Sequence, residues 1–166
     1  QLKDADGIIV PGGFGDRGIE GMISAIKYAR ENNVPYLGLC LGMQLTIVEF
    51  ARNVLGYHDA HSSEFNPSSV HQVIHIMPDQ DGVTDLGGTL RLGAYPCVLK
   101  EGSKSYELYG TKEISERHRH RYEVNNDYRE ALVANGMDLV GQSPDGHIVE
   151  MIEIPSHPWF IGTQAH

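Results

Sequence analysis

The sequence predicts one α/β domain built around a mixed sheet. Three observations support this fold class: short apolar runs bounded by glycine and proline, segments with apolar residues three and four positions apart, and later segments that alternate apolar and polar residues. The 166 residues are 40% hydrophobic and 21% charged, which suffices for one hydrophobic core. We therefore expect a single folded unit without internal repeats.

The first half of the chain predicts strands and helices in alternation. Residues 7–10 form an apolar run before Pro11, as expected of a strand that is buried on both faces. A helical spacing of apolar residues follows over 19–29, then a second strand over 35–39 and a second helix over 41–51. Short connections between such elements predict parallel strands joined by a right-handed crossover.

The second half predicts a more varied set of elements. A half-exposed strand is expected over 70–77, a polar loop over 78–88, and strand-like runs interrupted by glycine and proline over 90–99. The remaining expected elements are a short helix over 104–108, a strand over 118–124, a helix over 128–135, and closing strands over 139–142, 147–154 and 159–164.

Charge and composition exclude several classes of function. The chain has 13 Lys and Arg residues against 22 Asp and Glu, a net charge of −9, which disfavours binding along a nucleic-acid backbone. No apolar run approaches the roughly 20 residues that span a bilayer, so no membrane segment is expected. Two cysteines, Cys40 and Cys97, are too few for a disulfide framework, which predicts a cytoplasmic location, with Cys97 in the core. Because His166 ends the chain directly after a strand-like run, we expect a longer polypeptide.

Cys40 lies between a predicted strand and a predicted helix, flanked by Gly38 and Gly42. This arrangement is typical of a nucleophile elbow, in which close backbone packing requires the glycines. A helix N-terminus lowers a thiol pKa, and the backbone N–H of Leu41 can face a developing oxyanion. A small buried cysteine at the end of a strand is the alternative, but the flanking glycines favour a catalytic residue.

A thiolate nucleophile needs a base, and the chain contains nine histidines. His166 follows the last predicted strand, and the carboxyl ends of parallel strands meet at the sheet edge where sites of α/β proteins assemble. We therefore expect His166 to lie at the same edge as Cys40, although a terminal histidine can also be merely exposed. Six others fall in predicted loops or on strand faces and are interpreted as ordinary residues: His58, His61, His71, His75, His147 and His157.

The glycine-rich segment 11–15 connects the first strand to the first helix. Its backbone N–H groups can face an anion or a carbonyl oxygen. The segment lacks the Lys-Ser/Thr of a phosphate-binding loop and the spacing of a dinucleotide-binding turn. Beside the elbow at Cys40, we interpret it as a second oxyanion donor rather than as a plain tight turn.

The densest basic cluster is an alternating run of arginines and histidines. Strand alternation places Arg117, Arg119 and Arg121 on one face and His118 and His120 on the other. The functional interpretation is an arginine that binds a carboxylate, and the plainer one is a solvated or ion-paired strand. A metal site at the two histidines is disfavoured, because no further ligand lies nearby in the sequence.

Six blocks in chain order carry a resemblance to a known family: residues 11–15, 38–44, 63–65, 86–93, 117–125 and 157–166. They resemble the glutamine amidotransferase domains of the CTP synthase family, which are class I, triad-type glutaminases. The elbow marks class I domains in general, whereas the block 86–93, the Arg/His block and Met43 point to the CTP synthase member. The resemblance implies a flavodoxin-like fold with a mostly parallel or mixed central sheet and helices on both faces.

The resemblance also implies roles for site residues. Cys40 would attack the side-chain amide of L-glutamine, giving a γ-glutamyl thioester and ammonia, and His166 would be the general base and then the acid. The backbone amides of Gly13 and Leu41 would form the oxyanion hole. Arg121 suits the α-carboxylate and Glu64 the α-ammonium of glutamine. The family's substrate-binding positions match Gly13, Phe14, Leu41, Gln44, Glu64 and Arg121.

Other parts that the resemblance implies are absent from the sequence. The third triad residue would be a glutamate two residues after His166. An N-terminal amidoligase domain would bind UTP, ATP and Mg²⁺ and use the ammonia to make CTP, with GTP as an allosteric activator and a tetramer as the full-length assembly. Residues 1–166 would then be a glutaminase domain that is incomplete at both ends and has no cofactor or metal of its own.

Three alternatives stay open. A Cys-His-Asp α/β hydrolase of esters or lactones shares the Gly-x-Cys-x-Gly elbow but leaves Glu64 and Arg121 unexplained. Another class I amidotransferase would use the same glutaminase chemistry for a different synthesis. An inactive interaction module is disfavoured, because Cys40, Glu64, Arg121 and His166 are all present.

Overall fold

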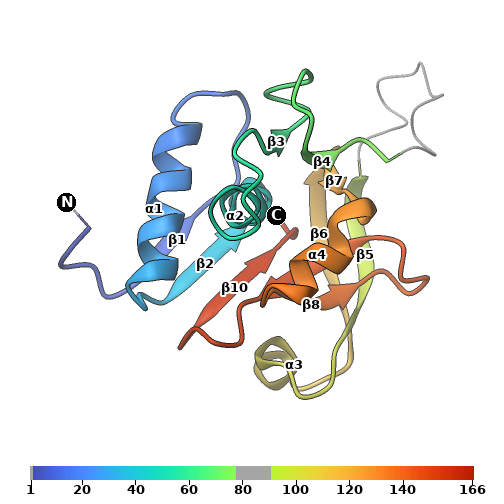
Figure 1. Ribbon diagram of the computed structural model, residues 1–166. Helices are drawn as coiled ribbons and strands as arrows, with labels where there is room; N and C mark the ends of the chain where they lie inside the picture. Colours follow the sequence, from blue (N-terminus) through green and yellow to red (C-terminus); the bar gives the residue numbers. More distant parts are fainter. Residues whose placement is uncertain (1, 78–90) are drawn as a thin grey trace.

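Two sheets and four helices make up the part of the chain that the computed structural model describes, residues 2–77 and 91–166 (Figure 1). In chain order the elements are β1 (Ile8–Val10), α1 (Ile19–Glu31), β2 (Tyr36–Leu39), α2 (Leu41–Asn53), β3 (His61–Ser62), β4 (Gln72–His75), β5 (Arg91–Leu99), α3 (Lys104–Tyr109), β6 (Glu113–His120), β7 (Glu123–Val124), a 3-10 turn (Asn126–Tyr128), α4 (Arg129–Ala134), β8 (Asp138–Gln142), β9 (Val149–Glu153) and β10 (Phe160–Thr163). The loop expected over 78–88 and the expected strand start at residue 90 lie outside the described residues. None of these helices is long and apolar enough to cross a membrane.

The large sheet has the strand order β1-β2-β10-β9-β8-β5-β6. β2 pairs in parallel with β1 and with β10, whereas all pairs from β10 to β6 are antiparallel. The sheet is therefore mixed, as predicted, and its parallel part is confined to β1, β2 and β10. Because α1 connects β1 to β2, this part contains the expected strand–helix–strand unit.

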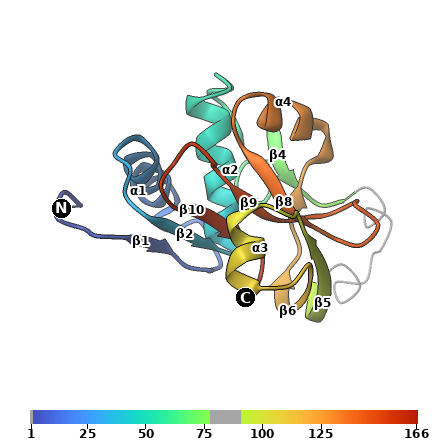
Figure 2. The same ribbon diagram turned by 90° about the horizontal axis from the view of Figure 1, so that it is seen from below.

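Helices cover both faces of the large sheet, as predicted (Figure 2). α1, α2 and α4 contribute to the larger core on one face, and α3 lies on the other face. Alternation along a strand divides neighbouring residues between the two cores: Phe160 packs in the larger one, and Ile161 packs in the smaller one with Tyr106 of α3. The centre of the sheet is buried on both sides, which explains the continuous apolar runs of its strands.

Helix α2 is buried more completely than its sequence pattern predicts. The expected apolar stripe implies a polar outer face, but every residue from Leu41 to Ala51 is buried. The reason is that α2 packs against α1, against the large sheet and against the small sheet of β3, β4 and β7. Glu49 on this helix is tolerated because it accepts hydrogen bonds from Nε and Nη2 of Arg30 on α1, the shortest at 2.7 Å.

The strands depart from the expectation in three respects beyond small shifts of their ends. The strand expected over 118–124 begins earlier and is interrupted, because β6 ends at His120 and β7 belongs to the small sheet. The chain therefore turns at Arg121 and Tyr122. β5 is continuous to Leu99 despite its glycine and proline. The two-residue strand β3 was not expected at all.

Candidate active site

Cys40 occupies a strained turn between β2 and α2. Its φ of 53° is positive, which among the non-glycine residues described is shared only with Asn33. The turn is held by a hydrogen bond of 2.8 Å from the Cys40 N–H to the carbonyl of Thr163 at the end of β10. A Cβ on Gly42 would lie 2.0 Å from the carbonyl oxygen of Val10, so glycine is required there. These contacts confirm the predicted elbow geometry.

Cys40 is nearly buried, with 7% of the residue's surface exposed. Burial raises the pKa of this thiol, and the hydrogen bonds from the Leu41 backbone and the Gln164 side chain offset this only in part. The negative charges of Glu123 and Glu64 raise the pKa further. The N–H of Leu41 at the helix N-terminus lowers the thiol pKa, as expected, but burial is the larger cause and the pKa lies above its usual value.

His166 lies beside Cys40, as predicted. A Cβ on Gly12 would lie 3.3 Å from Cβ of Cys40 and 3.4 Å from Nδ1 of His166, so both side chains flank one backbone position. The backbone N–H of His166 donates to the carbonyl of Arg117 on β6 at 2.8 Å, which fixes the chain after β10. The parallel pairing of β2 with β10 brings both residues to one edge of the sheet.

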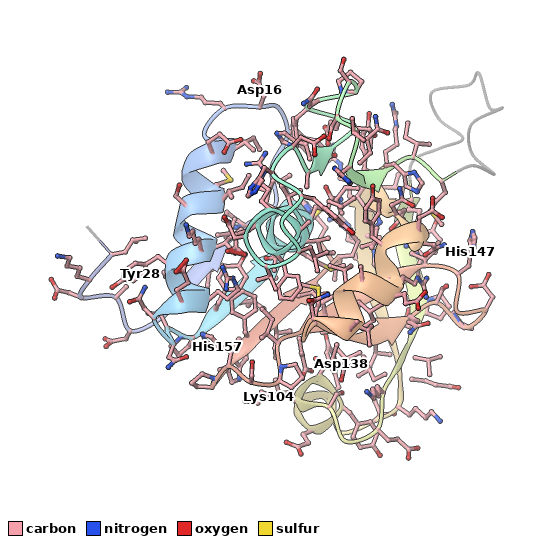
Figure 3. All side chains as sticks on the ribbon, in the orientation of Figure 1. Asp16, Tyr28, Lys104, Asp138, His147 and His157 are labelled. Carbon is pink, nitrogen blue, oxygen red and sulfur yellow. The ribbon has the colours of Figure 1, made fainter. Side chains whose placement is uncertain are left out.

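A pocket of about 310 Å³ opens in front of the thiol. Cys40 and all six residues expected to bind substrate line it: Gly13, Phe14, Leu41, Gln44, Glu64 and Arg121. Arg119, His120 and Tyr122 complete the wall, and His166 is not part of it. The pocket lies at the end of the sheet where the parallel strands finish. In Figure 3, Asp16, which follows β1, marks this end of the sheet, and His157, which precedes β10, marks the opposite end.

The pocket carries both signs of charge. Burial raises the pKa of the Glu64 carboxyl, while the nearby positive charge of Arg121 lowers it. Phe14 is 71% exposed at the rim, and the Arg119 guanidinium lies 5.5 Å from the centre of its ring. A small zwitterion can therefore meet a carboxylate and a guanidinium within one cavity.

The model of the family described as "Glutamine amidotransferase class-I" matches residues 1–166, which is the whole chain. The chain belongs to the class I glutamine amidotransferase family.

Relatives of this amidotransferase include CTP synthases. The CTP synthase of Staphylococcus aureus strain JH9 is 62% identical over 165 residues, covering 99% of this chain and 31% of that protein, so the chain spans under a third of that relative. The structure of the Trypanosoma brucei CTPS glutaminase domain with bound acivicin matches with a TM-score of 0.94 and 41% identity, covering 99% of this chain and 64% of that one. A glutamine amido transferase from Methylobacillus flagellatus, at 14% identity over 100% of this chain and 53% of that one, has a TM-score of 0.61 and shares the fold.

In this amidotransferase, sequence reasoning did not single out Gln164 as a neighbour of the thiol. Its buried side chain lies between two pocket residues, with Nε2 3.7 Å from Sγ of Cys40 and Oε1 3.3 Å from Nε2 of Gln44. Gln44 also donates to the carbonyl of Tyr122 at 3.1 Å. Gln164 belongs to the block 157–166 that carried the family resemblance, but only the strand pairing indicates that its side chain faces the thiol.

The Arg/His run places Arg121 in the pocket wall and two histidines, His118 and His120, in the interior. The predicted alternation is confirmed over residues 117–120, where the arginines are exposed and the histidines buried. Arg121 follows the end of β6 and instead lines the pocket. His118 pairs with Glu150 at 2.9 Å and His120 with Glu123 at 2.8 Å. The described residues contain no group of three or more His, Cys, Asp or Glu that could hold a metal ion.

Arg91 joins the two histidine pairs into one buried cluster, which we call the β5–β9 charge cluster: Arg91, His118, His120, Glu123 and Glu150. Nη1 of Arg91 binds Glu150 at 2.5 Å and Glu123 at 3.2 Å. Burial raises the pKa of Glu150, but His118 and Arg91 together outweigh it, so the pKa lies below its usual value. Cys97 lies in the smaller core, as predicted.

Proposed function

We propose that this chain is the glutaminase domain of a CTP synthase, which hydrolyses L-glutamine to L-glutamate and ammonia. The observation that carries the proposal is the position of Cys40 and His166 at one sheet edge, beside a pocket lined by Glu64 and Arg121. The identity of 62% to a CTP synthase supports the family member.

The reaction begins with transfer of the Cys40 proton to His166. The sulfur attacks the side-chain amide carbon of glutamine, and the N–H groups of Leu41 and Gly13 stabilise the oxyanion. His166 returns the proton to the leaving nitrogen, the C–N bond breaks, and ammonia departs from a γ-glutamyl thioester. Water then attacks the thioester with His166 as the base, which releases glutamate and restores the thiol.

The two ends of the substrate are recognised by charge. Arg121 binds the α-carboxylate and Glu64 binds the α-ammonium group, so the amino-acid head of glutamine is fixed at both poles. Burial raises the pKa of the Cys40 thiol, and the α-ammonium group of the substrate would bring a further positive charge into the pocket that favours the thiolate. A simple ester or lactone has no such head and leaves both charged residues without a function.

The whole protein is proposed to couple this site to synthesis. Ammonia passes to an amidoligase domain of the same polypeptide, where ATP and Mg²⁺ support the amination of UTP to CTP. GTP acts as an allosteric activator, a glutamate two residues after His166 orients the imidazole, and the full-length enzyme is a cytoplasmic tetramer. The support is the family resemblance together with the fact that this chain spans 31% of a CTP synthase.

Covalent labelling tests the proposal. A diazo-ketone analogue of glutamine should label Cys40 in the full-length protein, and an excess of L-glutamine should protect the thiol. Mass spectrometry of the peptide that contains Cys40 measures both effects, with a simple ester of the same length as the control reagent. Labelling by the ester, or labelling that glutamine does not prevent, would contradict glutaminase activity. Glutamine hydrolysis without any CTP formation would point to another class I amidotransferase.

A further inference from the structure

The side chain of Gln164 lies against the reacting sulfur. It is fully buried, and its backbone N–H donates to the carbonyl of Glu150 at 2.8 Å. The register of β2 and β10 pairs Thr163 with Leu39, so the residues that follow, Gln164 and Cys40, come to lie side by side. Nε2 of Gln164 is 3.7 Å from Sγ of Cys40, within hydrogen-bonding distance of a sulfur acceptor.

The direction of this amide is fixed by its neighbours. The carbonyl of Tyr122 can only accept, so Gln44 must present its NH₂ group to it at 3.1 Å. The same NH₂ group lies 3.3 Å from Gln164, which must therefore present its oxygen to Gln44. The NH₂ group of Gln164 is then left to face the sulfur.

The surroundings of the sulfur favour such a donor. The carbonyl of Arg119 lies 3.9 Å from Sγ and can accept from the thiol but cannot stabilise a thiolate. The groups that donate to the sulfur are the Leu41 N–H and the Gln164 amide. The titratable or charged side chains around the sulfur come from the pocket wall, the small sheet and the end of β10: Glu64, Arg119, His120, Arg121, Glu123 and His166.

We propose that Gln164 is a further catalytic residue, whose side-chain amide donates a hydrogen bond to the Cys40 thiolate and stabilises it as nucleophile and as leaving group. This deepens the proposed glutaminase function and rests on it. The hydrogen bond is strongest when the sulfur carries negative charge, which happens before attack on the amide and again when the thioester is hydrolysed. Gln44 acts on the sulfur only through Gln164 and is a positioning residue in this respect.

The test measures the ionisation of Cys40 directly, without substrate. The rate of alkylation by iodoacetamide is followed against pH in the full chain, and mass spectrometry of the Cys40 peptide separates it from Cys97. Gln164→Met should raise the midpoint of this pH–rate profile by about one pH unit, because the thiolate loses a hydrogen-bond donor. The matched control is Gln142→Met on β8, a partly buried amide that accepts from Arg129, and its midpoint should not move.

Two further variants keep the test decisive if Gln164→Met does not fold. Gln164→Glu has the same shape but places a carboxylate beside the sulfur, and should raise the midpoint at least as far. Gln44→Met releases the orientation of Gln164 and should raise it in the same direction. The double variant Gln44→Met/Gln164→Met should have the same midpoint as Gln164→Met alone, because both substitutions act on one hydrogen bond.

An unchanged midpoint in folded Gln164→Met or Gln164→Glu overturns the inference, and so does a full additive effect in the double variant. Glutamine hydrolysis by the wild-type protein with an unchanged midpoint removes Gln164 from catalysis but leaves the proposed function intact. A shifted midpoint without any glutamine hydrolysis by the wild-type full-length protein overturns the proposed function, and with it the catalytic role of Gln164.

Discussion

The turn at Cys40 concentrates backbone strain at the residue that we propose as the nucleophile. A positive φ in a residue with a Cβ costs about 1 to 3 kcal/mol and persists only where surrounding contacts hold it. Here the contacts are the hydrogen bond to Thr163 and the close approach of Gly42 to Val10. The tight packing of Gly42 and the hydrogen bond to Thr163 thus support a sulfur that faces the pocket.

Gly42→Ala should destabilise the fold by at least about 2 kcal/mol, because the new Cβ would meet a backbone oxygen that cannot move away cheaply. Gly21→Ala in α1 is the matched control. Nothing lies within 4 Å of a Cβ there, and alanine should stabilise the helix by about 0.5 to 1 kcal/mol. Urea unfolding of both variants measures the difference, and equal stabilities would remove the steric argument.

Arg121→Ala should raise the KM for glutamine by about tenfold or more, because the α-carboxylate loses a charged partner. The kcat should fall much less, since Arg121 is not assigned to the reacting atoms. Arg117→Ala, an exposed arginine on β6, is the control and should leave both constants unchanged. Steady-state glutaminase kinetics of the full-length protein decide this, and an unchanged KM in Arg121→Ala would exclude it from substrate binding.

The residue types around Cys40 alone could predict its position in an elbow, but not the pKa of its thiol. The glycines and the position between strand and helix identify the elbow from local sequence. The pKa of the thiol depends on burial and on Glu64 and Glu123, which are brought near it by the fold. Local sequence therefore predicts the proposed nucleophile and leaves its charge state open.

At the scale of elements, the β5–β9 charge cluster ties the antiparallel half of the sheet to the pocket. Arg91 on β5 and Glu150 on β9 lie on strands that are separated in the sheet by β8, and His120 is both a member of the cluster and part of the pocket wall. Buried charges of this kind are stable only when each keeps a partner. The cluster therefore anchors the end of β6, which immediately precedes Arg121 in the chain.

Glu150→Gln should destabilise the protein by about 3 kcal/mol at neutral pH, because Arg91 and His118 lose a buried carboxylate. The pKa of Glu150 is depressed in the folded state, so its contribution is complete above the unfolded value of about 4.5 and is lost as the pH falls through the lower folded value. The difference in unfolding free energy between wild type and Glu150→Gln should therefore become smaller below that pH. Urea unfolding at neutral and acidic pH measures it, with exposed Glu113→Gln as the control; a gap independent of pH would contradict the ionised pair.

Element types were predictable where the apolar period is strong, as in α1, β2 and α2. The limits of β6 were not, because its first half contains only one apolar residue, Ile114, and its end is set by pairing with β5 from Arg91 to Val98. A strand of two residues such as β3 has no periodicity to read. Its existence depends on parallel pairing with β4.

At the scale of the whole molecule, the site depends on one long-range pairing. The register of β2 against β10 aligns Leu39 with Thr163, and it places Cys40 beside both Gln164 and the end of the chain at His166. A parallel arrangement of these strands could be predicted from the sequence, and with it the shared edge. The register could not, because it is set by packing of distant segments rather than by any local pattern.

The proposed division between ammonia production and ammonia use gives a prediction for the full-length enzyme. Cys40→Ala should abolish glutamine-dependent CTP formation, since no thioester can form, and should leave CTP formation from added ammonium salts near the wild-type rate. The small loss of volume at a turn that already excludes most solvent should leave the fold intact, which circular dichroism checks. Equal loss of both activities in a folded variant would mean that Cys40 serves the ligase reaction or the domain contact, and the assignment of the thiol to glutamine hydrolysis alone would fail.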